Sequence, residues 1–151
     1  MYELRRQQSI PRHIDEVFAF FSDASNLERI TPPWLRFRIL GEAGAIGAGT
    51  LLDYELRWHV FPIRWRTEIV EWDPPHRFAD VQLRGPYRSW HHTHSFRDEE
   101  GSTRMTDVVR YQLPFGIFGR VAHAIRLRRD LERVFDYRSS AIEALFPPSS
   151  R

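Results

Sequence analysis

The stretch Ser-Trp-His-His-Thr-His at positions 89–94 holds the side chains of this sequence that are best suited to chemistry. It places three of the chain's seven histidines within four positions. Imidazole changes its charge near neutral pH and serves as a metal ligand, as a general acid or base, or as a hydrogen-bonding group. Three kinds of site are therefore open: a metal centre, a catalytic base, or the polar lining of a pocket.

Residues 87–96 (YRSWHHTHSF) have the alternating pattern of a β-strand, and this pattern divides the histidines between two faces. His91 points to one side of the strand. The opposite face combines two histidines with two large apolar side chains: Trp90, His92, His94 and Phe96. Because of its apolar members, we predict that this second face points inward.

The next predicted strand, 103–113, offers an acid. Its more apolar face carries Met105, Asp107, Val109, Tyr111 and Leu113. If the inner faces of the two strands coincide, Asp107 lies one strand away from His92 or His94, within hydrogen-bond reach. Tyr111, on the same face, is a further candidate for contact with a ligand.

Three interpretations of this cluster compete. As a metal site, it offers His92, His94 and Asp107, but two histidines and one acid on another strand are a weaker signature than zinc sites usually show. As a catalytic site, a histidine paired with Asp107 can act as a general base. The interpretation that we favour is a satisfied polar patch lining a pocket or a core, because buried polar groups require partners.

The elements that position these residues follow from apolar periodicity and turn signals. The pattern predicts a strand at 2–10, a helix at 14–23 and a short helix at 24–30, which the Pro32-Pro33 pair ends. Further strands are expected at 37–40, 50–60, 63–72, 77–83, 87–96 and 103–113. After Pro114-Phe115-Gly116 the apolar pattern predicts one long helix that ends at Phe146. Its apolar stripe contains Phe118, Val121, Ile125, Leu131, Val134, Phe135, Ile142 and Leu145.

This order predicts an α+β architecture. An antiparallel sheet with one apolar face must be covered, and the final helix is the only element long enough to cover it. A curved sheet around a single helix does not close tightly along its whole length, so we expect a cavity between them that holds a ligand.

Aromatic side chains on two other predicted strands are candidates for the lining of this cavity. Strands 50–60 and 63–72 carry Tyr54, Trp58 and Trp65 on their inner faces, although a core requires the same residues. The outer faces oppose acids and arginines, which we interpret as a solvated cross-strand ladder rather than an anion site: Asp53, Glu55 and Arg57 against Arg64, Arg66 and Glu68.

Two candidates come from outside the strands. Arg128 lies where the apolar stripe between Ile125 and Leu131 continues, so we predict that it reaches the cavity and pairs with an acid. Trp34 follows two prolines and is positioned to gate the cavity mouth. The remainder of the arginine-rich run 126–133 contains acids, and we interpret it as a solvated helix face rather than a nucleic-acid surface.

Composition excludes several other functions. All 22 basic residues are arginine, and with no lysine or cysteine a net charge of +2 suffices to raise the isoelectric point to about 9.4. This value is therefore weak support for nucleic-acid binding.

The absence of cysteine excludes disulfides and thiolate chemistry. The amino terminus lacks the apolar region of a secretory signal and no apolar run is long enough to span a membrane, so we expect a cytoplasmic protein.

Together these features resemble the START-like helix-grip superfamily (SRPBCC), which includes polyketide cyclase/dehydrases and lipid-transfer domains. The local strings that carry the resemblance are VFAFFSDASNLERITPPWLRFRIL (17–40), IRWRTEIVEWDPPHRFADVQLRGPYRSWHHTHSF (63–96) and RRDLERVFDYR (128–138). They are similar to an uncharacterised bacterial subgroup of cyclase/dehydrase-like proteins. A similar domain with a Thr-Pro-Pro-Trp stretch, as at 31–34, occurs fused to nucleoside-sugar-epimerase-like oxidoreductases.

The resemblance implies a helix-grip domain over 1–146, followed by a flexible tail at 147–151. Its curved antiparallel sheet of about six to seven strands wraps around the long C-terminal helix, with two short helices after the first strand. We predict that the cavity binds a small hydrophobic or amphipathic molecule, without a metal or a cofactor. The alternatives are a cyclase/dehydratase-type enzyme that uses His92 or His94 with Asp107 on a ketone or hydroxyl, and a partner module of an oxidoreductase.

Overall fold

The computed structural model describes residues 1–42, 44–113 and 120–148, with the backbone alone for 120–124. Its elements, in chain order, are β1 (Tyr2–Ile10), α1 (Ile14–Phe21), the 3₁₀ turn η1 (Ala24–Asn26), α2 (Leu27–Ile30), the 3₁₀ turn η2 (Pro33–Leu35), β2 (Arg38–Leu40), β3 (Leu51–Trp58), β4 (Phe61–Asp73), β5 (Arg77–Arg84), β6 (Ser89–Glu99), β7 (Ser102–Gln112) and α3 (Arg120–Leu145).

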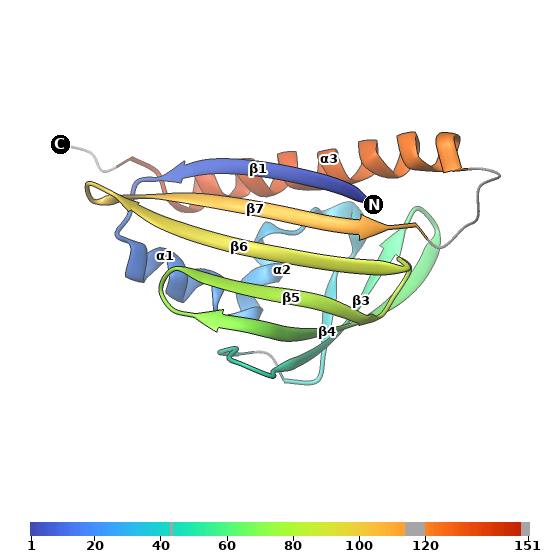
Figure 1. Cartoon of the computed structure of the whole chain (residues 1–151), viewed down its shortest axis with the longest axis horizontal. Helices are drawn as coiled ribbons and strands as arrows, with labels where there is room; N and C mark the ends of the chain where they lie inside the picture. The colour runs from blue at the N-terminus through green and yellow to red at the C-terminus, as the bar shows by residue number, and fades with distance from the viewer. Residues whose placement is uncertain (43, 114–119, 149–151) are drawn as a thin grey trace.

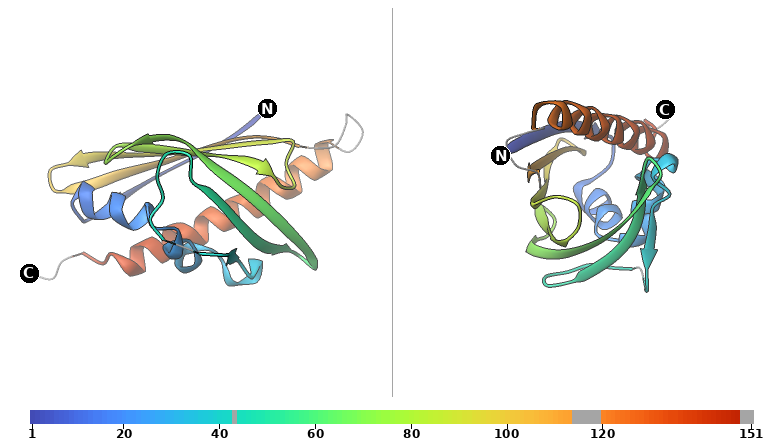
Figure 2. Two further views of the ribbon diagram at one scale, coloured as in Figure 1. Left: turned by 90° about the horizontal axis from the view of Figure 1, so that it is seen from below. Right: turned by 90° about the vertical axis from the view of Figure 1, so that its right-hand side faces the viewer.

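The strands form one seven-stranded sheet in the order β1-β7-β6-β5-β4-β3-β2, and each neighbouring pair is antiparallel. The sheet is strongly curved, and α3 runs along its open side (Figures 1 and 2). The short helices occupy the inside of the curve, where α1 packs on β6 and β7 and α2 packs on α3. The concave face of the sheet and α3 therefore enclose the space in which the predicted site residues lie.

Local signals fix where the short helices begin and end. The side chain of His13 accepts a hydrogen bond from the Asp15 backbone N–H at the start of α1, and Asp23 accepts one from Ser25 at the start of η1. The Pro32-Pro33 pair comes directly after the end of α2, and the helix ends there because proline cannot continue the helical hydrogen-bond pattern.

The apolar core has two parts, which lie on either side of the cluster around His92 and His94. The first joins α1, the sheet and the end of α3 through Ile10, Ile14, Val17, Phe18, Phe21, Ile30, Ile69, Phe78, Phe96, Met105, Ile142 and Phe146. The second joins β1, β7 and α3 through Leu4, Val109, Tyr111, Leu113, Leu131 and Phe135. Tyr111, a predicted ligand contact, is one of these core residues and stacks on Tyr2 with ring centroids 5.4 Å apart.

The predicted architecture is confirmed: the sheet is antiparallel, one long C-terminal helix covers it, and short helices follow the first strand. The observed elements match the predicted ranges closely, and β1 matches to the residue. Phe118 and the side chain of Val121, both assigned to the helix stripe, lie outside the described residues, as does part of the predicted tail at 147–151.

Candidate functional site

A cavity of about 700 Å³ lies between the concave face of the sheet and α3. Its lining is mainly apolar and comes from both short helices, from β3 to β6 and from α3. This volume falls within the range of small-molecule sites, which are typically about 300–1,000 Å³. The predicted cavity is therefore present.

The aromatic candidates all line this cavity: Trp34, Tyr54, Trp58, Trp65 and Trp90. Tyr54 stacks on Trp65 with centroids 5.8 Å apart, and Trp90 meets the same indole edge to face at 5.2 Å. Trp58 donates its Nε1–H to Asp130 Oδ2 on α3 at 2.8 Å, which links the β3–β4 hairpin to the helix. Trp34 is the most exposed of the five and lies under the guanidinium of Arg133.

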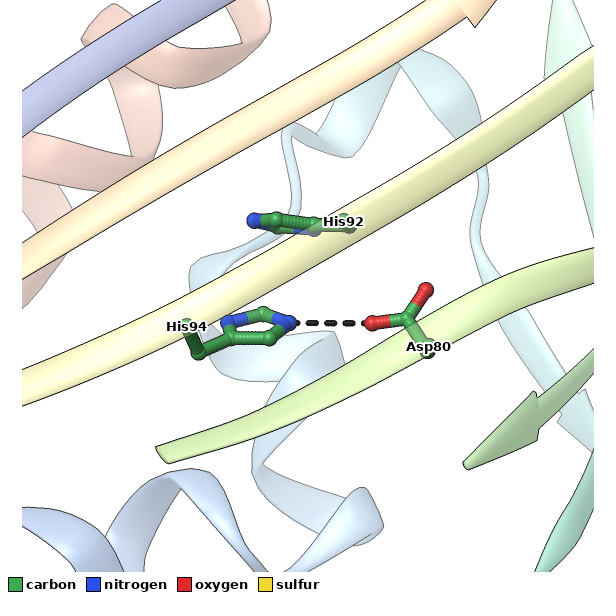
Figure 3. A group of neighbouring side chains, drawn as sticks. All are labelled: Asp80, His92 and His94. Atoms are coloured by element: carbon green, nitrogen blue, oxygen red, sulfur yellow. Dashed lines mark hydrogen bonds and ion pairs between the residues drawn. The ribbon is translucent and has the colours of Figure 1, made fainter. Parts of the chain in front are cut away.

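One buried polar cluster interrupts the apolar surface. His92 Nε2 lies 2.7 Å from Asp107 Oδ1. His94 Nε2 lies 2.9 Å from Asp80 Oδ2, and Figure 3 shows this bond with His92 beside it. His94 Nδ1 lies 3.3 Å from the same oxygen of Asp107, without the alignment of a hydrogen bond. From the helix side, Arg138 Nη2 donates to Asp107 Oδ1 at 3.3 Å. The predicted proximity of His92, His94 and Asp107 is therefore confirmed, and we call these three residues together with Asp80 and Arg138 the polar cluster.

Both carboxyl groups of the polar cluster are held in the ionised form. Burial acts to raise the pKa of Asp107, but the charge of Arg138 and the hydrogen bond from His92 outweigh it and hold this pKa well below its ordinary value. Burial likewise acts to raise the pKa of Asp80, but the hydrogen bond from His94 and the nearby positive charges lower it. Each carboxylate is therefore stabilised by cationic or hydrogen-bonding partners.

The two histidines shift in opposite directions. Burial, followed by the charge of neighbouring His94, lowers the pKa of His92 despite the nearby Asp107. Burial also disfavours the charged form of His94, but the carboxylates of Asp107 and Asp80 outweigh it and raise the pKa of this histidine. At a pH between these two shifted pKa values, His94 is protonated and His92 is neutral, so that one imidazolium and the Arg138 guanidinium balance the two carboxylates.

The hydrogen bond to Asp107 also sets the tautomer of neutral His92. Because ionised Asp107 can only accept a hydrogen bond, His92 Nε2 must carry the proton, which leaves Nδ1 with a lone pair. His92 lines the cavity, so this nitrogen can accept a hydrogen bond or a proton from a bound molecule. Asp107 has the complementary role of orienting the ring.

The arginines that reach the cavity are Arg133 and Arg138, whereas Arg128 was the one predicted. Arg128 is half-exposed, pairs with Glu132 at 3.3 Å and does not line the cavity. The inward stripe of the helix instead passes through Leu127, Leu131, Val134, Phe135, Arg138 and Ile142. Arg128 follows Leu127 by one residue, or about 100° around the helix, and therefore turns away from the sheet.

The structure separates the other predicted site residues into lining and supporting positions. His92, His94 and the five aromatics line the cavity, whereas Asp107 lies behind the histidines and Tyr111 lies in the core. Sequence reasoning missed Asp80, which lines the cavity from β5 directly opposite His92 in the register. The sequence signal that could have identified Asp80 is its position two residues after Phe78, because residues two apart on a strand share a face and Phe78 points inward.

The geometry of the cluster also bears on metal binding. Among the described residues, Asp80, His92 and His94 have possible ligand atoms within 4.8 Å of one another. However, the histidine rings lie close together, with centroids 3.8 Å apart and planes inclined by 31°, and His94 Nε2 and Asp80 Oδ2 are already bonded to each other at 2.9 Å. A metal about 2.0–2.1 Å from both nitrogens would require one ring to turn and the bond between His94 and Asp80 to break. This arrangement therefore does not fit a metal.

Similar structures share the fold along nearly the whole chain. A protein of Thermus thermophilus is 22% identical with a TM-score of 0.67, and the alignment covers 95% of this chain and 99% of that one. Ginseng major latex-like protein 151 from Panax ginseng is 14% identical with a TM-score of 0.70, at 97% and 98% coverage. No functionally curated protein matches the sequence.

A third similar structure is the nucleoside-diphosphate sugar epimerase from Corynebacterium glutamicum, at 24% identity and a TM-score of 0.70. The match covers 92% of this chain but 28% of the epimerase, so the likeness concerns one part of a longer protein. Residues 1–140 match the family described as "Polyketide cyclase / dehydrase and lipid transport". With its seven-stranded curved sheet around a C-terminal helix, the chain belongs to this family, within the START-like helix-grip superfamily.

Proposed function

We propose that this protein binds a small hydrophobic or amphipathic molecule in the cavity, with a polar group of the ligand directed at His92 and Asp80. The observation that carries the proposal is an apolar cavity of about 700 Å³ with one buried polar cluster in its wall. The family description, which includes lipid transport, supports the same class of ligand.

The physical basis is burial of apolar surface. A ligand that buries about 200 Å² of apolar area gains about 5 kcal/mol, at about 25 cal/mol per Å². A polar group on the same ligand requires a partner in the cavity, and His92 Nδ1 and Asp80 are acceptors on the lining. This combination favours a hydroxyl-bearing apolar molecule over a purely aliphatic one.

Native mass spectrometry of the protein purified from its own source tests the proposal, since a tightly held ligand co-purifies. The variant Leu56→Trp fills part of the cavity, because Leu56 lines it. Leu83→Trp is the matched control at an exposed position of β5. We expect the ligand with the wild type and with Leu83→Trp but not with Leu56→Trp; equal retention by both variants contradicts binding in the cavity.

A second candidate function is catalysis with His92 as the general base. The observation that favours it is the pair of a neutral His92, with its free lone pair, and an ionised Asp107 that orients it. The co-purified molecule, incubated with fresh protein, is the test. Turnover that is lost in His92→Gln but kept in His91→Gln supports an enzyme, whereas no chemical change in the molecule supports a binding protein.

We also propose that the protein acts beside an oxidoreductase in the cytoplasm, without contact with nucleic acid. The match to part of a sugar epimerase supports an association of this kind of domain with such enzymes. No helix among the described residues is long and apolar enough to cross a bilayer. Gel filtration of the protein mixed with an oxidoreductase encoded beside it tests the association; separate elution of the two contradicts it.

A further inference from the structure

The mouth of the cavity is marked by the lining residues that are exposed to solvent. These residues come from three different elements: Trp34 of η2, His59 of the turn between β3 and β4, and Arg133 of α3. The other described lining residues are buried or half-buried. The cavity therefore opens between η2, the end of the β3–β4 hairpin and α3.

Arg133 is held at this mouth by an aromatic contact. Its guanidinium carbon lies 5.3 Å from the centre of the Trp34 ring. Trp34 in turn packs edge to face on Tyr137, with ring centroids 5.7 Å apart. A cation–π contact of this kind positions the guanidinium without bonding an oxygen to its N–H donors.

The acidic side chains nearest to Arg133 along α3 are bonded to other partners. These pairs are Asp130 with Trp58 and His59, Glu132 with Arg128, and Asp136 with Arg6. Arg133 itself forms no salt bridge or side-chain hydrogen bond among the described residues. It is therefore a cation at the cavity mouth whose donors are available to a bound molecule.

The inner end of the cavity does not suit a negative charge. Asp80 lines the wall there as an ionised carboxylate and repels an anion. The positive charge of Arg138 nearby is already paired with Asp107, at 3.3 Å. An ion placed so deep would also lose its water without an equivalent partner. An anionic group of a ligand is therefore best held at the mouth, where Arg133 is exposed and water remains.

We propose that Arg133 binds an anionic group of the ligand, such as a carboxylate, while the apolar part of the ligand lies in the cavity. This inference rests on the proposed function and narrows the ligand class to amphipathic acids. The guanidinium suits this role because its fork of donors matches the two oxygens of a carboxylate. A hydroxyl at the other end of the ligand would reach His92 and Asp80.

Two fluorescent probes with the same aromatic skeleton test the inference. N-phenyl-1-naphthylamine is neutral, and 8-anilinonaphthalene-1-sulfonate differs from it only by a sulfonate. The sulfonate oxygens stand in for those of a carboxylate, since both groups accept hydrogen bonds from a guanidinium. Fluorescence titration gives the dissociation constant of each probe, and the neutral probe reports the apolar part of the binding alone.

Arg133→Gln removes the charge from the mouth, and its exposed position favours normal folding. We expect this variant to bind the sulfonate about fivefold more weakly than the wild type, the effect of one partly exposed ion pair. Its affinity for the neutral probe should not change. Equal weakening of both probes, or no weakening of either, overturns the inference.

Arg129→Gln is the matched control. It removes the same charge about one turn earlier on α3, from an exposed residue that does not line the cavity. We expect its affinity for the sulfonate to fall by less than about twofold, as for an exposed charge that makes no direct contact. A loss as large as in Arg133→Gln would show that the general charge of the helix attracts the probe, and the role of Arg133 falls.

Salt provides a second readout. An exposed ion pair is screened as the ionic strength rises from about 0.01 M to about 1 M. The difference between the wild type and Arg133→Gln in sulfonate binding is therefore expected to shrink over this range. A difference of the same size at both salt concentrations would show that Arg133 acts by packing on Trp34, and it overturns the inference.

The outcomes distinguish this inference from the proposed function. If Leu56→Trp abolishes binding of both probes but Arg133→Gln affects neither, the binding cavity stands and the role of Arg133 alone is overturned. If neither probe binds the wild type, or if Leu56→Trp binds both as well as the wild type does, the support for a ligand in the cavity is removed and the inference falls with it.

Discussion

Two sets of charged side chains in this protein have nearly the same contact distances and opposite surroundings. On the outer face of the sheet, Arg66 forms a bidentate pair with Asp53, with nitrogen–oxygen distances of 2.8 and 3.1 Å. On the inner face, the polar cluster holds His92 and Asp107 at 2.7 Å and His94 and Asp80 at 2.9 Å. The outer pair is open to water, whereas the inner groups are nearly all buried.

The difference shows that contact distance does not measure the importance of an ion pair. Water and salt screen an exposed pair, so that losing one partner costs little. In a buried cluster, losing one partner leaves another charge without compensation, and this is strongly destabilising. A buried cluster of this kind is weak evidence for a stabilising role, and its position in the cavity wall supports the proposal that a ligand binds there.

Among these substitutions, Arg138→Met is expected to lower the stability of the protein the most. The variant keeps much of the apolar contact with Phe21 and Phe135, but it leaves the carboxylates of Asp107 and Asp80 with one cation between them. We expect the free energy of unfolding to fall by about 3 kcal/mol, the loss typical of a broken buried pair. Urea denaturation measures it.

A second substitution identifies the cause of that loss. Adding Asp107→Asn to Arg138→Met removes the uncompensated charge, so the double variant is expected to be less destabilised than the sum of the single variants. Additive losses would show that Arg138 acts by packing alone, and the contrast between the inner cluster and the outer pair would then disappear.

The sequence was sufficient to predict the fold because its signals are local. Alternation in 87–96 places His92 and His94 on the inner face, and turn residues separate the strands of an antiparallel sheet. The apolar faces of β3 and β4 likewise predicted Tyr54, Trp58 and Trp65 as inward-facing residues, and all three line the cavity. None of these inferences needs the register between distant strands.

Asp80 and Arg138 were missed because their roles depend on non-local geometry. Asp80 faces His92 only through the register of β5 with β6, and the pairing of β4 with β5 contains irregularities that the pattern does not reveal. Arg138 lies three residues after Phe135 and four before Ile142, which is the spacing of an inward stripe. An arginine at such a position indicates a buried acid opposite, but only the packing of α3 against the sheet identifies that acid as Asp107.

Asp80→Asn is expected to lower the stability of the protein by less than Arg138→Met does. The amide oxygen of asparagine can still accept a hydrogen bond from His94 Nε2, but the negative charge that helps to raise the pKa of His94 is gone. We therefore expect the pKa of His94 to fall and the stability to decrease by about 1–2 kcal/mol. An NMR titration of the imidazole signals measures the pKa.

Asp53→Asn on the outer face is the matched control, because it removes a carboxylate far from the cluster in the register. The pKa of His94 should not change in this variant. An unchanged pKa in Asp80→Asn as well would show that Asp107 alone sets the charge of His94.

The dependence of stability on pH follows from the signs of the histidine shifts. His94, whose pKa is raised, contributes stability that is complete below its unfolded pKa of about 6.5 and is lost as the pH rises through its folded pKa. His92, whose pKa is lowered, contributes stability above about pH 6.5 that is lost as the pH falls through its folded pKa. Asp80 and Asp107 add a loss at still lower pH.

We therefore expect the free energy of unfolding to be greatest near pH 6.5, about the unperturbed pKa of histidine. Urea denaturation across about pH 4–9 measures it, and His94→Asn is expected to flatten the decline above about pH 6.5. The titratable groups that contact His94 are Asp80, Asp107 and His92, and the pKa of each is lowered, so none of these three supplies the decline. A stability that rises steadily up to the alkaline end of this range contradicts the assignment of the proton to His94.

Arg66→Met on the outer face is expected to have the smallest effect, and it is the sharpest test of the comparison. The hydrogen bond from Arg66 is the largest influence that lowers the pKa of Asp53, so this pKa should rise measurably in the variant. Stability should nevertheless change little, because both groups are exposed and the unfolded chain solvates them almost as well. Urea midpoints at low and high salt measure this, and any small difference from the wild type should vanish at high salt, where exposed pairs are screened. If the midpoint instead falls as far as in Arg138→Met and salt has no effect, burial is not what separates the two sets of charges.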